Sequence, residues 1–82
     1  MSDKQRLLEA VDRALALANA ALEEPSADRL EAARHQARAL VPQLANVRRL
    51  HLTLAEADRL MRSMHQLQRT LAAVEHRPAP PG

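Results

Sequence analysis

The sequence predicts an all-α fold of three helices, in which the last two form an antiparallel helical hairpin with bundle or coiled-coil-like packing. Apolar residues recur at alternating steps of three and four, which places them on one face of a helix. The apolar set is mainly 14 Leu and 17 Ala, and the only β-branched residues are four Val and two Thr. This composition favours helices over strands. The single glycine is Gly82, so no glycine interrupts the helices.

The first helix is expected over residues 3–24. Ser2 and Gln5 have the spacing of a capping box, and Pro25 requires the helix to end before it. The apolar stripe of this helix consists of Leu8, Val11, Leu15, Ala18 and Leu22, widened on one flank by Leu7, Ala14 and Ala21.

The second helix is expected over residues 27–50, with Ser26 as its N-cap. Pro42 lies inside it. A proline removes one helical hydrogen bond and clashes with the carbonyl group four residues earlier, here that of Arg38. Because the apolar pattern continues past Pro42, we expect a kinked helix, and a break at Val41 is the alternative.

The third helix is expected over residues 54–77, since Thr53 and Glu56 form a second capping box. Its stripe consists of Ala57, Leu60, Met64, Leu67, Leu71 and Val74. Residues 78–82 are rich in proline, and we expect them to be a disordered tail beyond a single helical domain of residues 1–77.

The core of so short a chain is expected to be shallow, because 82 residues include no aromatic side chain. Two interpretations follow: a small monomeric bundle, or a chain that completes its core with a partner. The length of the stripes favours the second, through a partner helix or self-association as a homodimer. No apolar run is long enough to span a membrane. We therefore expect a cytoplasmic protein of bacterial type with no membrane partner.

Candidate chemistry is sparse, and we expect no enzymatic activity, no cofactor and no metal site. The four histidines lie in three different segments and none forms a His-x-x-x-His pair: His35, His51, His65 and His76. The residues after His35 do not match a phosphotransfer domain. Arg6 and Arg13 fit the first helix of a small helical mutase, but Lys4 is the only lysine, and no converging set of acids and bases accompanies them.

A stripe on the third helix is the candidate partner-binding surface. It comprises Leu60, Met61, Met64, Leu67 and Leu71. Leucine and methionine at helical spacing suit an adaptable groove for another helix. The alternative is that the same residues form ordinary core.

Charge is unevenly distributed along the chain. Residues 1–31 carry four bases and seven acids, a net charge of −3, whereas residues 32–74 carry seven Arg and two acids, a net charge of +5. The candidate basic patch consists of Arg34, Arg38, Arg48 and Arg49. It could bind nucleic acid through phosphates, although no aromatic side chain is present to stack on bases. The alternative is an acidic first helix that packs against two basic helices.

The overall pattern resembles that of the small helical chaperones and co-chaperones of type III secretion and flagellar export. The resemblance rests on Leu7-Leu8-Glu9-Ala10-Val11, on Arg59-Leu60-Met61-Arg62-Ser63-Met64, and on the layout of three heptad helices. It implies a protein that shields the amphipathic helix of an export substrate or of another chaperone. We therefore expect a non-enzymatic, chaperone- or adaptor-like module that acts through helix–helix contacts. A small nucleic-acid-binding or regulatory protein is the alternative.

Overall fold

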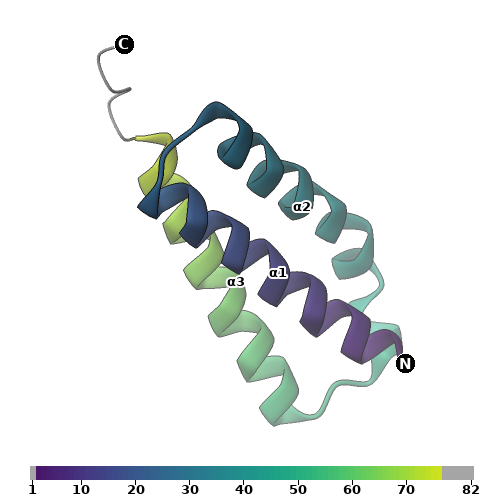
Figure 1. Cartoon of the computed structure of the whole chain (residues 1–82). Helices are drawn as coiled ribbons and strands as arrows, with labels where there is room; N and C mark the ends of the chain where they lie inside the picture. Colours follow the sequence, from purple (N-terminus) through teal and green to yellow (C-terminus); the bar gives the residue numbers. More distant parts are fainter. Residues whose placement is uncertain (1, 77–82) are drawn as a thin grey trace.

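Three α-helices and one short 3₁₀ helix make up the computed structural model, which describes residues 2–76 (Figure 1). The α-helices are α1 (Asp3–Glu23), α2 (Ala27–Ala45) and α3 (Leu54–Glu75), and the 3₁₀ helix η1 (Val47–Leu50) lies between α2 and α3. No strand occurs in this part of the chain. The predicted all-α class is confirmed. Residues 78–82, the predicted tail, lie outside the described residues.

The start of each α-helix is fixed by a local side-chain cap. The hydroxyl oxygen of Ser2 accepts a hydrogen bond from the Gln5 backbone N at 3.2 Å, and Gln5 Oε1 accepts one from the Ser2 backbone N at 3.3 Å. Ser26 Oγ accepts from the Arg29 backbone N at 3.1 Å. A second reciprocal box joins Thr53 and Glu56. These contacts satisfy backbone donors that have no partner inside the helix, and they confirm the three predicted caps.

The second helix is shorter than expected. It continues through Pro42, so the alternative break at Val41 does not form, but it ends at Ala45 rather than at residue 50. Asn46 Nδ2 donates to the carbonyl oxygen of Pro42 at 3.2 Å, and residues 47–50 tighten into η1. A 3₁₀ turn can satisfy carbonyl groups left over at a helix end. His51 follows in a left-handed conformation, with φ 51° and ψ 54°, and turns the chain toward α3.

Helix α1 is the central element, because α2 and α3 each pack along it and contact each other little (Figure 1). Although α2 and α3 run antiparallel, the close seam expected between them is made with α1 instead. The reason is the wide apolar arc of α1, five of whose residues are buried: Leu7, Val11, Ala14, Ala18 and Ala21. Three of these are alanines, which let neighbouring helices approach closely.

The core joins these α1 residues to the inner faces of the other two helices. Leu40 on α2 is 1% exposed and Leu67 on α3 is 2% exposed. Ala33, Leu60, Thr70 and Val74 are also buried. Full burial of one leucine contributes about 1.5–3 kcal/mol, so a few side chains supply much of the stability.

Ion pairs on the surface connect the helices. Asp12 on α1 pairs with Arg59 on α3 at 2.9 Å, and Lys4 on α1 pairs with Glu56 on α3 at 3.1 Å. Glu24, just after α1, pairs with Arg29 on α2 at 2.9 Å. Two of these pairs, Asp12–Arg59 and Glu24–Arg29, join an acid near the start of the chain to a base of a later helix, whereas Lys4–Glu56 has the opposite polarity. Exposed pairs of this kind contribute only about 0.2–1 kcal/mol each.

Candidate protein-binding surface

Three large apolar side chains remain exposed on the outside of the bundle. Val41 on α2 is 64% exposed, and on α3 Leu54 is 89% and Met61 is 66% exposed. Scattered exposed leucines are common on proteins. Their arrangement relative to one another therefore decides whether they form a surface.

Helical spacing relates all three residues to the side on which α2 and α3 meet. That side is marked by an ion pair, in which Arg34 Nε of α2 lies 3.2 Å from Glu75 Oε1 of α3. A step of seven residues along a helix returns to nearly the same face, with a drift of about 20°. Seven residues after Arg34 is Val41. Successive steps of seven back from Glu75 reach Gln68, Met61 and Leu54.

The same two helices also carry half-buried apolar side chains. Ala37 and Leu44 of α2, and Met64 and Leu71 of α3, pack against the core without being fully covered. Because α2 and α3 contact each other little, this strip is not closed by the two helices themselves. We call it the α2–α3 face; it consists of Ala37, Val41, Leu44, Leu54, Met61, Met64 and Leu71.

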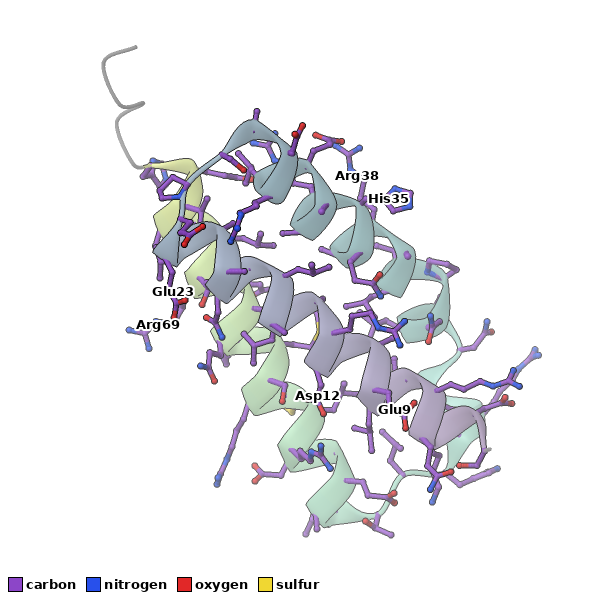
Figure 2. All side chains as sticks on the ribbon, in the orientation of Figure 1. Glu9, Asp12, Glu23, His35, Arg38 and Arg69 are labelled. Carbon is purple, nitrogen blue, oxygen red and sulfur yellow. The ribbon has the colours of Figure 1, made fainter. Side chains whose placement is uncertain are left out.

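We take three exposed arginines of α2 and η1 as the rim of the α2–α3 face. Arg38, three residues before Val41, is exposed and extends away from the bundle next to His35 (Figure 2). Arg48 and Arg49 in η1 are exposed as well. None of these three arginines makes an ion pair with a residue that the structure describes. Arg34, the fourth member of the predicted basic patch, is half-buried and paired with Glu75.

The predicted partner-binding stripe is largely part of the core. Leu60 is 6% exposed and Leu67 is 2% exposed, so neither can reach a partner while the bundle is closed. Met64 and Leu71 are half-buried, and only Met61 is freely exposed. The sequence analysis missed Val41 and Leu54. The repeat of seven that joins Leu54, Met61, Gln68 and Glu75 was the signal that could have identified the outward face.

The histidines do not gather. All four are exposed: His35 lies on α2, His51 follows η1, His65 lies on α3 and His76 is at the end of α3. Within residues 2–76, no three His, Cys, Asp or Glu side chains lie together in a way that could hold a metal ion.

Arg6 and Arg13, the arginines expected of a helical mutase, do line one open groove, of about 650 Å³, between α1 and α2. Gln36 and Gln43 of α2 also line it, as do the acids Asp3 and Glu9. Acids and bases alternate there, so the groove has no strong preference for one sign of charge. Lys4 is not part of it and pairs with Glu56 instead.

Comparisons with protein-family models, with curated proteins and with solved structures find no match to this chain. None of the described helices has the length and apolar character required to cross a membrane.

Proposed function

We propose that the chain is a non-enzymatic protein-binding module, chaperone- or adaptor-like, which acts through helix–helix contacts in the cytoplasm of a bacterium. The observation that supports this most directly is the α2–α3 face. Every large apolar side chain found strongly exposed in residues 2–76 lies on it: Val41, Leu54 and Met61. A contiguous apolar strip with a polar rim is typical of a surface that binds another protein.

The occupant that fits this face is an amphipathic helix of another protein with acidic residues along its flanks. A strip between two antiparallel helices suits a third helix that lays its apolar side along it. Arg38, Arg48 and Arg49 on the rim would attract acidic flanks and orient the partner. A second copy of this chain would bring the same three arginines to the interface, so like charges oppose face-to-face self-association.

The test uses a synthetic helical peptide with leucines and methionines on one side, acidic residues on its flanks and one tryptophan. The chain contains no Phe, Tyr or Trp, so the peptide fluorescence has no aromatic background from the protein. We expect binding that weakens about tenfold in Met61→Ser and in Val41→Ser, as for loss of about 1.4 kcal/mol at an interface. Ala16→Ser, at an exposed position on α1, is the control and should leave affinity unchanged.

A second peptide with lysine flanks tests the role of the rim. It should bind more weakly than the acidic peptide, and Arg38→Gln should reduce that difference, whereas Arg13→Gln in the α1–α2 groove should not. Equal binding by both peptides, or by all variants, contradicts the proposal. Light scattering of the chain alone reports self-association; a dimer abolished by Met61→Ser would show that a second copy occupies the face instead.

Nucleic-acid binding is the second candidate, because Arg38, Arg48 and Arg49 are exposed and make no ion pair with described residues. Binding through phosphates must weaken steeply as salt rises. A titration with duplex DNA at two salt concentrations tests this. Salt-sensitive DNA binding that is lost in Arg48→Gln, together with no peptide binding, would reverse the ranking of the two functions.

A further inference from the structure

Besides the α1–α2 groove, the surface has a depression beside the C-terminal end of α1. It lies on a different side of α3 from the α2–α3 face. Its volume is about 760 Å³, and it is lined on α3 by Arg62, His65, Gln66, Arg69, Thr70 and Ala73. Positions 62, 66, 69 and 73 recur at steps of four, three and four, so they share one side of the helix. Leu22 of α1 also lines the depression.

The lining of this depression has one sign of charge. It contains two arginines and one histidine, and none of the described residues that line it is Asp or Glu. Arg62 Nε is held by Asp58 Oδ2 at 3.1 Å, which leaves the other guanidinium nitrogens of Arg62 available. Arg69 is exposed and makes no ion pair with a described residue. The site therefore differs from the α1–α2 groove, where acids and bases alternate.

Thr70 places a hydroxyl group in the lining of the depression. The residue is only 9% exposed. Its hydroxyl makes no hydrogen bond with a described residue, and it still reaches solvent, since no fully buried side-chain oxygen or nitrogen lacks a partner in residues 2–76. The hydroxyl can therefore donate a hydrogen bond to a ligand atom in the depression.

The ligand chemistry follows from the donors. The guanidinium group of arginine binds tetrahedral oxyanions well, because several of its N–H groups point in parallel. The Thr70 hydroxyl and the Gln66 amide, one helical turn apart, add neutral donors on the same side of α3. We propose that this depression binds a phosphate-sized oxyanion, with Arg62 and Arg69 supplying the positive charge and Thr70 and Gln66 supplying hydrogen bonds.

The site does not rest on the proposed protein-binding function. Arg62, Gln66 and Arg69 lie on a different side of α3 from the line of Leu54, Met61 and Gln68. Figure 2 shows Arg69 on α3 and Arg38 on α2 on opposite sides of the bundle. Arg38→Gln therefore makes a control with the same change of net charge as Arg69→Gln.

The experiment is an NMR titration of the full chain with inorganic phosphate, against sodium chloride at equal ionic strength. We expect saturable shifts of the Thr70 backbone amide, the Gln66 side-chain amide and the Arg69 Nε–H group. Arg69→Gln should weaken phosphate binding about tenfold, equivalent to about 1.4 kcal/mol. Thr70→Val, which keeps the shape but removes the hydroxyl, should also weaken it, and Arg38→Gln should leave it unchanged. Circular dichroism first confirms that each variant is folded.

Three results would overturn the proposal: chloride producing the same shifts as phosphate, Arg38→Gln weakening binding as much as Arg69→Gln, or Thr70→Val having no effect. A parallel titration with glycerol 3-phosphate distinguishes the source of the anion. Binding of both compounds indicates that the site accepts phosphate esters, and binding of phosphate alone indicates a site for the free anion.

Discussion

Lys4 Nζ lies 3.1 Å from Glu56 Oε1, although the two residues are 52 positions apart in the chain. The same carboxylate oxygen accepts a hydrogen bond from the Thr53 backbone N at 2.9 Å. Glu56 thus caps α3 and links it to α1 with one side chain. These hydrogen bonds lower the pKa of Glu56 below its ordinary value of 4.5; the one from the Thr53 backbone has the larger effect and the one from Lys4 the next largest.

Acidification should therefore remove a stabilising contribution from Glu56. Because its pKa is lower in the folded chain, the contribution is fully present above pH 4.5 and is lost as the pH falls through the folded pKa. Urea unfolding followed by circular dichroism should show a difference between wild type and Glu56→Gln at neutral pH that shrinks in acid. Glu9→Gln, at an exposed position on α1, is the control. A difference that stays constant with pH would contradict this account.

Core and surface leucines on α3 should respond very differently to truncation. Leu67 is 2% exposed and Leu54 is 89% exposed. Leu67→Ala should lower the free energy of unfolding by about 2–5 kcal/mol, because it leaves a cavity. Leu54→Ala should change it by no more than about 0.5 kcal/mol. Urea unfolding of both variants provides the measurement, and comparable losses would show that the described packing of α3 is wrong.

The N-cap of α3 should contribute measurably to stability. Thr53 Oγ1 accepts a hydrogen bond from the Glu56 backbone N at 3.1 Å. Thr53→Ala should cost about 1 kcal/mol, and Thr53→Ser, which keeps the hydroxyl, should cost much less. Thermal unfolding separates the two variants. If they are destabilised equally, the methyl group rather than the cap is responsible.

Replacement of Pro42 should extend or strengthen the end of α2. Pro42→Ala restores an N–H group that can donate to the carbonyl of Arg38, and it removes a clash with that carbonyl. In a helix interior, this replacement stabilises the helix by about 3 kcal/mol. The gain should be smaller here, since Pro42 lies in the last turn of α2. Far-UV circular dichroism should show higher helicity. Pro25→Ala, between α1 and α2, is the control, and lower helicity in Pro42→Ala would refute the prediction. The kink itself remains a prediction.

The candidate surface could be predicted only in part. The sequence indicated that α3 has a Leu/Met stripe, and Met61, Met64 and Leu71 do belong to the α2–α3 face. It could not show that Leu60 and Leu67 turn inward toward α1, because adjacent stripes on one helix look equally apolar in the sequence. The exposure of Val41 could not be predicted either, because it depends on where α3 lies and not on the neighbours of Val41 in the chain.

The sequence by itself determined the three helices and where each begins. Ser2, Ser26 and Thr53 bond to backbone groups three residues away, and contacts of that kind depend only on local sequence. Only the tertiary structure decided that α1 is the central helix, which apolar stripe faces inward, and which charges pair. Ion pairs such as Arg34–Glu75 join residues 41 positions apart. Such pairs form only after the three amphipathic helices have packed. How they pack is a tertiary matter, since each helix offers more apolar surface than one neighbour can cover.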